Sequence, residues 1–128
     1  MSLAATNPIG FIPTANPAAA RAFYEQTLGL TFVSDDAFAL VFRVGPTQTM
    51  LRIARTPDFK PVPYTIFGWE VSDIEATVTT LTAKGIEFLS FGLPNQSTNG
   101  IWQAPGGASI AWFKDPDGNT LSVSSHPA

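Results

Sequence analysis

Two stretches of the chain carry apolar residues at helical spacing, and each has a clear beginning and end. The first begins at Asn16-Pro17, where Asn is a favourable N-cap and Pro suits the first helical position, and it stops before Gly29. The second begins at Ser72–Glu75, where Ser and the Glu three residues later form a capping box, and it stops at Lys84-Gly85. The pattern therefore predicts two helices.

The other apolar segments are short and are bounded by Gly, Pro, Asn and Asp, a pattern typical of β-strands joined by turns. Strands are predicted at 9–14, 30–34, 38–44, 50–55, 64–71, 86–91, 101–104, 108–114 and 120–124. A Pro-rich segment, residues 56–63, divides this series and is predicted to be a linker.

The elements on the two sides of this linker follow the same order, which indicates an internal repeat. An offset of 56 residues places Asn16 on Ser72 and Gly29 on Gly85, and an offset of 57 fits the helix caps about as well. We therefore expect a single α+β domain, residues 1–128, of two β-α-β-β-β modules at about 8–55 and 64–124. Each helix covers one face of its strands, and the other faces would form a curved mixed sheet around a cleft.

Composition narrows the classes of function. Charged residues make up only 13% of the chain, about half the usual share, which suggests a surface covered by a second subunit or a ligand. A surface rich in Ser, Thr, Asn and Gln explains the low charge equally well. The net charge of −3 and the scattered basic residues argue against nucleic-acid binding, and no apolar stretch is long enough to cross a membrane. Without a recognisable signal segment, the expected location is the cytoplasm.

Three motifs carry a resemblance to a known family. They are AFYEQTLGL at residues 22–30, FGWEVSD at 67–73 and WFKDPDGN at 112–119. In this order and at these spacings the chain resembles the vicinal oxygen chelate superfamily, also called the glyoxalase/bleomycin resistance/dioxygenase family, over roughly residues 8–124. The resemblance implies the paired fold around a cleft, subunits that associate as a homodimer, and, in the family's enzymes, a divalent metal held at four equivalent strand positions.

Counting from the motifs places these four positions at Ile9, Arg52, Ile66 and Ser122. None is a credible ligand, because isoleucine has no lone pair and arginine is a permanent cation. The one histidine, His126, is interpreted as a solvated terminal residue. We therefore expect no metal and no other cofactor.

Strand alternation extends the predicted cleft to further residues. If Ile66 faces the cleft, so does Glu70, and if Arg52 faces it, so does Met50, with Phe11 beside them. Such a cleft suits an apolar or aromatic molecule with one charged or hydrogen-bonding group. The alternative is that Arg52 and Glu70 pair with each other or point to solvent.

Aromatic and acidic residues elsewhere are mostly assigned structural roles. Trp102 is the exception, because it lies between the polar loop 95–100 and Pro105–Gly107, where a large aromatic lines a site or an interface. Most of the other strand aromatics, a group that includes Phe38 and Trp112, are expected in the core. The Asp residues at 35, 36, 115 and 117 are assigned to turns.

Three hypotheses of function remain. The first is a metal-free protein that binds a small apolar or aromatic molecule in its cleft. The second is a glyoxalase-type lyase or isomerase, or a dioxygenase, that uses a metal or base not identified from the sequence, and Glu70 is its one candidate for a general base. The third is a dimeric protein without a small-molecule function.

Overall fold

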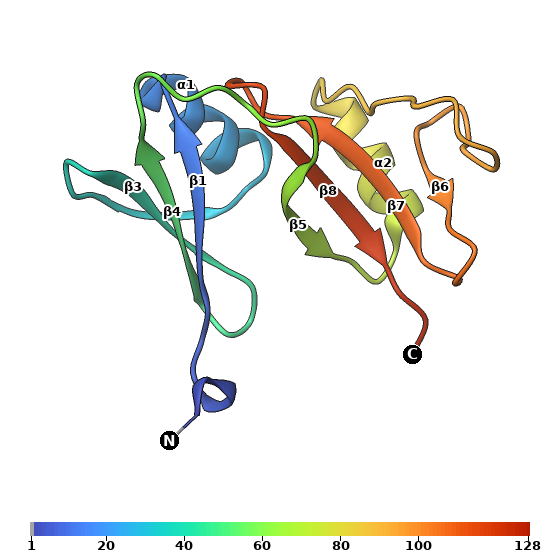
Figure 1. The fold of residues 1–128 in the computed structure, drawn as a ribbon, viewed down its shortest axis with the longest axis horizontal. Helices are drawn as coiled ribbons and strands as arrows, with labels where there is room; N and C mark the ends of the chain where they lie inside the picture. Colours follow the sequence, from blue (N-terminus) through green and yellow to red (C-terminus); the bar gives the residue numbers. More distant parts are fainter. Residues whose placement is uncertain (1) are drawn as a thin grey trace. The chain divides into compact units, whose positions relative to one another are not determined.

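The computed structural model describes residues 2–128 and forms two compact units, Met1–Lys60 and Pro61–Ala128 (Figure 1). The boundary between them falls inside the Pro-rich segment 56–63. Within residues 2–128, no helix is both long and apolar enough to cross a membrane.

The first unit is a four-stranded mixed sheet with one helical segment. A short 3-10 turn, η1 (Leu3–Ala5), precedes it. The elements are β1 (Ile9–Thr14), α1 (Pro17–Ala22), η2 (Phe23–Thr27), β2 (Thr31–Asp35), β3 (Ala39–Val44) and β4 (Thr49–Arg55). In the sheet β1 pairs with β4 in parallel, and the other pairs are antiparallel, in the order β1-β4-β3-β2.

The second unit consists of β5 (Thr65–Glu70), α2 (Ile74–Ala83), β6 (Trp102–Gln103), β7 (Ser109–Lys114) and β8 (Thr120–Ser125). It repeats the topology of the first unit, with the order β5-β8-β7-β6 and a parallel pair formed by β5 and β8. The predicted α+β class is confirmed, as two four-stranded mixed sheets with few helices.

The first helix begins as predicted, because the Asn16 side chain accepts a hydrogen bond from the Ala19 amide at 3.3 Å. After six α-helical residues it widens into the π-helical turn η2, in which the Leu28 amide donates to the Phe23 carbonyl. Gly29 then adopts φ +77°, a left-handed conformation that ends the helix at little cost.

Two expectations for the second unit are wrong. Asp73, not Ser72, caps α2, and its carboxylate accepts from the Ala76 amide at 3.0 Å. The predicted strand 86–91 is irregular, although its Leu89 amide donates to the Trp112 carbonyl. The Leu89 carbonyl and the Phe91 amide are hydrogen-bonded to the side chain of Gln96, and not to a neighbouring strand.

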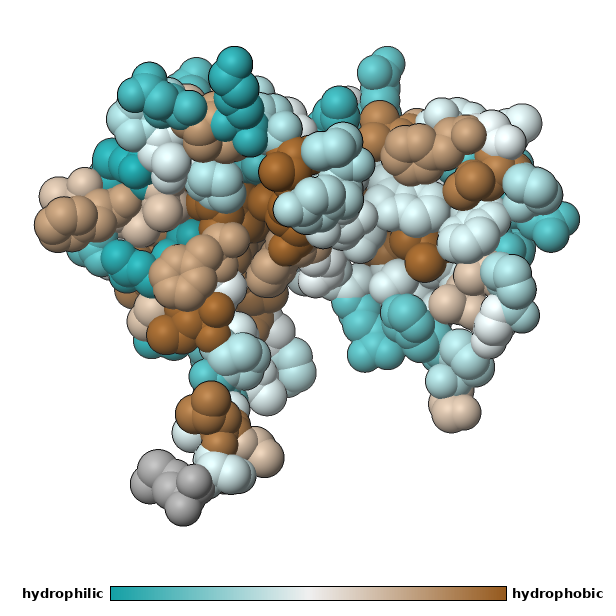
Figure 2. All heavy atoms as spheres, viewed as in Figure 1, coloured by the Kyte–Doolittle hydropathy of each residue, from teal (hydrophilic) through white to brown (hydrophobic). Residues whose placement is uncertain are grey.

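Each helix covers one face of its own sheet (Figure 1). In the first unit the buried side chains under the helix include Ile12, Phe42, Leu51 and Ile53, with Tyr24 from η2. In the second unit they include Val78, Ala111, Phe113, Leu121 and Val123. The opposite sheet faces carry side chains that their own unit leaves uncovered, and Figure 2 shows apolar residues gathered over the front of the first unit.

Candidate functional site

A pocket with mostly aromatic walls lies within the second unit, and we call it the aromatic pocket. It has a volume of about 330 Å³. The start of β5, the irregular segment after α2, and strands β6, β7 and β8 all contribute to it. Its lining consists of Pro63, Tyr64, Thr65, Phe91, Leu93, Trp102, Trp112 and Thr120.

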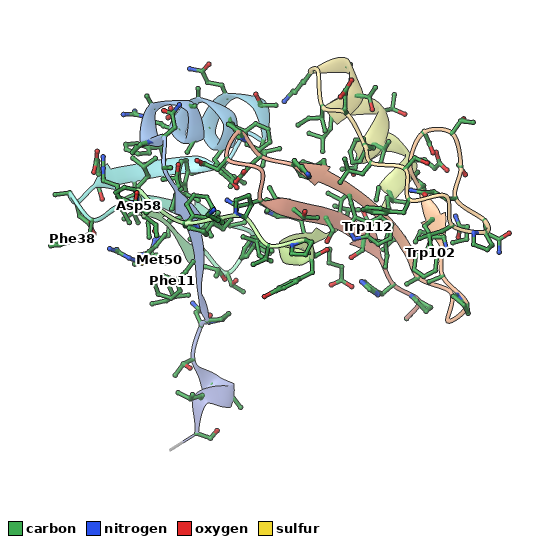
Figure 3. The ribbon with its side chains drawn as sticks, turned by 45° about the horizontal axis from the view of Figure 1, so that its top comes forward. Phe11, Phe38, Met50, Asp58, Trp102 and Trp112 are labelled. Atoms are coloured by element: carbon green, nitrogen blue, oxygen red, sulfur yellow. The ribbon has the colours of Figure 1, made fainter. Side chains whose placement is uncertain are left out.

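Two indole rings lie next to each other in this pocket, on the paired strands β6 and β7 (Figure 3). The ring centroids of Trp102 and Trp112 are 5.9 Å apart, and the ring planes are inclined by 31°. The Phe91 ring meets Trp112 edge-on, at 5.2 Å and 74°. Aromatic pairs at these separations attract one another, so the three rings form one packed wall.

The polar end of Trp102 is satisfied inside the protein. Its Nε1–H donates a hydrogen bond to the Pro94 carbonyl at 3.0 Å. This bond fixes the orientation of the indole and leaves the faces of its ring for apolar contact.

The pocket exposes large apolar groups to water. Tyr64 is 64% exposed and Phe91 is 52% exposed, and Leu93 beside them is also exposed. None of the lining residues carries a charge. Contiguous exposed apolar surface of this kind marks binding sites in folded proteins, and an uncharged lining favours an uncharged guest.

Most of the strand aromatics were expected in the core, and half-buried Trp112 is an exception. Its strand neighbours Ala111 and Phe113 are fully buried under α2, so alternation along β7 turns Trp112 to the opposite face. The same alternation was readable from the sequence. Phe38 is a second exception, because it is 77% exposed at the turn between β2 and β3.

The predicted site residues of the first unit share the sheet face that α1 does not cover. Ile9 and Phe11 are exposed on β1, and Met50 and Arg52 follow on the paired strand β4 (Figure 3). The Arg52 guanidinium forms an ion pair with Asp36 at 2.8 Å. The ion-pair partner of Arg52 is therefore Asp36, and not Glu70 or solvent as the alternative drawn from the sequence proposed.

Asp36 also has the predicted turn role. Its carboxylate accepts from the Phe38 and Ala39 amides at 3.0 and 2.9 Å. The Ala39 amide, followed by the Arg52 guanidinium, lowers the pKa of Asp36 below its ordinary value. The turn is predictable from the sequence, whereas the ion pair joins residues that are far apart along the chain.

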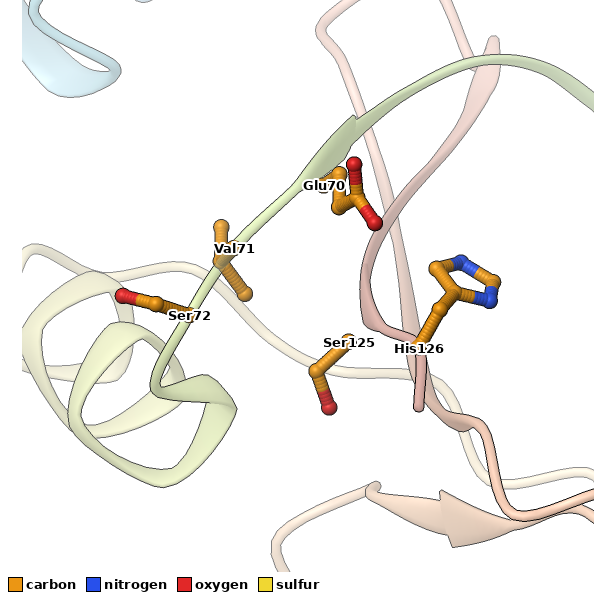
Figure 4. Close-up of a pocket in the computed structure, with 5 residues that line it drawn as sticks. All are labelled: Glu70, Val71, Ser72, Ser125 and His126. Atoms are coloured by element: carbon orange, nitrogen blue, oxygen red, sulfur yellow. The ribbon is translucent and has the colours of Figure 1, made fainter. Parts of the chain in front are cut away.

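Glu70 lines a different pocket of the second unit, of about 370 Å³, together with Val71, Ser72, Ser125 and His126 (Figure 4). Its strand partner Ser124 is hydrogen-bonded through Oγ to His126 Nε2 at 2.9 Å. His126 is exposed, as expected for a terminal residue. Trp102 and Glu70, both predicted site residues, thus line separate pockets.

Ile66 and Ser122 complete the predicted set. The β5–β8 register skips Ile66, which lies at a bulge between Thr65 and Phe67, so simple alternation does not carry from Ile66 to Glu70. Ser122 pairs with Gly68, and its hydroxyl occupies the space that a side chain at Gly68 would need.

The family described as the Glyoxalase/Bleomycin resistance protein/Dioxygenase superfamily matches residues 5–123. The chain belongs to this superfamily. The strand register of this chain agrees with its own internal repeat, because Leu51 and Leu121 occupy equivalent buried positions opposite Gly10 and Phe67.

Solved structures of the superfamily share the fold. A member from Sphaerobacter thermophilus DSM 20745 is 25% identical with a TM-score of 0.76, over 98% of this chain and 100% of its own. A bleomycin resistance determinant encoded on the transposon Tn5 is 20% identical with a TM-score of 0.73, over 95% and 98%. A bleomycin-binding protein complexed with bleomycin is 23% identical with a TM-score of 0.72, over 94% and 98%. No curated protein matches the sequence.

Proposed function

We propose that this superfamily member binds a small, uncharged aromatic molecule in the aromatic pocket of its second unit, without a catalytic metal. The observation that carries the proposal is the aromatic wall in which the Trp112 ring contacts both Phe91 and Trp102, in a pocket whose lining carries no charge. A planar guest gains contact with indole faces whose orientation is already fixed, so little ordering opposes binding.

The size of the pocket agrees with such a guest. Its volume of about 330 Å³ lies at the lower end of the range for small-molecule sites, which suits one or two fused rings better than an extended ligand. Three of its lining residues, Tyr64, Thr65 and Thr120, carry hydroxyl groups that can form hydrogen bonds with a polar substituent of the guest.

The relatives support a binding role in general terms. One structural neighbour is a bleomycin-binding protein in complex with its drug, and another is a bleomycin resistance determinant. Their identity to this chain is low, so they favour capture of a small molecule without indicating which one.

The chain's residues do not fit the divalent metal that the superfamily's enzymes use. Ile9 and Ile66 have no donor atom, Arg52 is a cation held by Asp36, and the Ser122 hydroxyl packs over Gly68. Within residues 2–128 there is no group of three His, Cys, Asp or Glu residues that could hold a metal. Glu70, the candidate base of the enzyme hypothesis, lines another pocket than the aromatic rings.

The proposal is tested by titrating chelator-treated protein with 2-naphthol and following tryptophan fluorescence. All three tryptophans lie in the second unit, so quenching reports binding there. Trp102→Ala should weaken binding by about tenfold or more, as the loss of a central aromatic contact does at other sites. Circular dichroism establishes that the variant is folded.

Phe38→Ala is the matched control, because Phe38 is an exposed aromatic of the first unit and has no part in the pocket. It should bind 2-naphthol as the unaltered protein does. Absence of binding by the unaltered protein, or equal affinities for Trp102→Ala and the unaltered protein, would overturn the proposal.

A further inference from the structure

One irregular segment of the second unit supplies much of the aromatic pocket, and we call residues 89–101 the pocket loop. It contributes Phe91 and Leu93 to the lining and the Pro94 carbonyl to the indole of Trp102. Repeating secondary structure does not support it, and Asn95 in its middle has φ +65°. Isolated backbone bonds, such as that from the Leu89 amide to the Trp112 carbonyl, and side-chain bonds therefore share the task of fixing the Phe91 ring.

The Gln96 side chain provides three of these bonds. Its Nε2 donates to the Leu89 carbonyl at 2.9 Å and to the Gly100 carbonyl at 3.0 Å. Its Oε1 accepts from the Phe91 amide at 2.9 Å. One half-buried amide thus joins the beginning of the pocket loop to its end, and uses both of its donors and its acceptor in doing so.

We propose that Gln96 is the positioning residue of the aromatic pocket and that it determines the pocket's affinity for flat guests. This inference rests on the proposed function. Gln96 does not line the pocket, and its effect passes through its neighbours. The Gln96 side chain holds the backbone amide of Phe91, whose ring packs on Trp112. The backbone of Gln96 also forms a β-bridge with Trp102.

Other bonds hold the outer part of the pocket loop independently of this side chain. Asn99 Nδ2 donates to a carboxylate oxygen of Glu75 on α2 at 3.2 Å, and the Ser97 amide donates to the Ile101 carbonyl at 2.8 Å. Replacement of Gln96 should therefore loosen the aromatic wall while the loop remains attached and the second unit remains folded.

The test uses Gln96→Ala and Gln96→Met, of which the second keeps most of the side-chain volume and removes all three bonds. Gln26→Ala is the matched control, since Gln26 is exposed on η2 of the first unit. Two quantities are measured, the affinity for 2-naphthol and the hydrogen-exchange rate of the Trp102 indole N–H. Its NMR signal is assigned through Trp102→Phe.

Both Gln96 variants should bind 2-naphthol about tenfold more weakly, and their Trp102 indole should exchange about tenfold faster. Gln26→Ala should change neither quantity. An unchanged affinity for 2-naphthol together with an unchanged exchange rate of the Trp102 indole N–H in the Gln96 variants would overturn the inference. Loss of the near-ultraviolet circular dichroism signal in both Gln96 variants would also overturn it, because the residue would then be needed for folding of the whole unit.

The two proposals fail in distinguishable ways. If the unaltered protein binds no 2-naphthol, the proposed function fails, and the exchange rate still decides whether Gln96 positions the rings. If the unaltered protein binds, Trp102→Ala does not, and both Gln96 variants behave as the unaltered protein, the proposed function stands and Gln96 has no positioning role.

Discussion

The turn between β7 and β8 depends on one buried carboxylate, and its removal gives a sharp prediction for stability. Asp115 is 6% exposed, and its side chain accepts hydrogen bonds from three donors, each at 2.9 Å. They are the Asp117 amide, the Asn119 amide and the Asn119 side-chain Nδ2. Asn119 is itself 2% exposed, so water cannot readily replace the lost acceptor.

The expected cost of Asp115→Ala follows from these bonds. A hydrogen bond to a charged acceptor contributes roughly 1.5–3 kcal/mol, and three that share one carboxylate are not additive. We expect a loss of about 3 kcal/mol in the free energy of unfolding. With a urea dependence of about 1.5 kcal/mol per molar, typical of a chain this size, the unfolding midpoint should fall by about 2 M.

The assay is urea unfolding followed by tryptophan fluorescence, because every tryptophan lies in the unit that contains this turn. Asp58→Ala is the control, since Asp58 is an exposed aspartate of the first unit (Figure 3) and its replacement should change stability by less than about 0.5 kcal/mol. A fall in the midpoint of less than about 0.5 M for Asp115→Ala, at an unchanged slope, would refute the structural role of this carboxylate.

Three further predictions concern a buried indole, an ion pair and the uncharged lining of the aromatic pocket. The Trp69 indole N–H is buried without a partner among the described residues, so Trp69→Phe should leave the urea midpoint of unfolding unchanged or raise it. A loss of more than about 1.5 kcal/mol in the free energy of unfolding would contradict this. Hydrogen bonds from the Arg55 guanidinium and, to a smaller extent, from the Ala37 amide hold the pKa of Asp35 below its ordinary value of 3.8. The Asp35 carboxylate therefore stabilises the fold above about pH 4, and this contribution is lost as the pH falls through the lowered pKa of the folded state. Thermal melts of Asp35→Asn should therefore depend less on pH between about pH 5 and about pH 3 than those of the unaltered protein, and parallel curves would disprove the contribution. The anion 2-naphthoate should bind at least about tenfold more weakly than 2-naphthol in calorimetric titrations, because the pocket offers no partner for its charge, and equal affinities would show that the lining is misassigned.

Much of the fold was predictable because its signals are local. Asn16 marks the start of the first helix through its side-chain preference for capping. Gly29 and Gly85 mark the ends of the two helices through their positive φ, at equivalent places in the two halves. The strand at 86–91 was not predictable as irregular, because its course depends on Gln96, several residues further along the chain. Alternation of apolar residues cannot reveal such a side-chain bond.

The candidate site was predicted only in part. Trp102 was singled out by the loops around it, and it lines the aromatic pocket. Phe91 and Tyr64 were missed, since aromatic residues in or beside strands are usually core, and their exposure follows from tertiary packing. The binding roles of Ile9, Phe11, Met50, Arg52, Ile66 and Ser122 remain predictions, as do the homodimer and the cytoplasmic location.

Binding of an uncharged aromatic molecule by the second unit is tested most directly by NMR. Amide and indole signals of chelator-treated, ¹⁵N-labelled protein are followed as 2-naphthol is added. The largest shifts should fall on Phe91, Leu93, Trp102 and Trp112, and the signals of the first unit should stay in place. Shifts centred on other residues, or no shifts near saturation of the probe, would contradict the assignment of the aromatic pocket as the binding site.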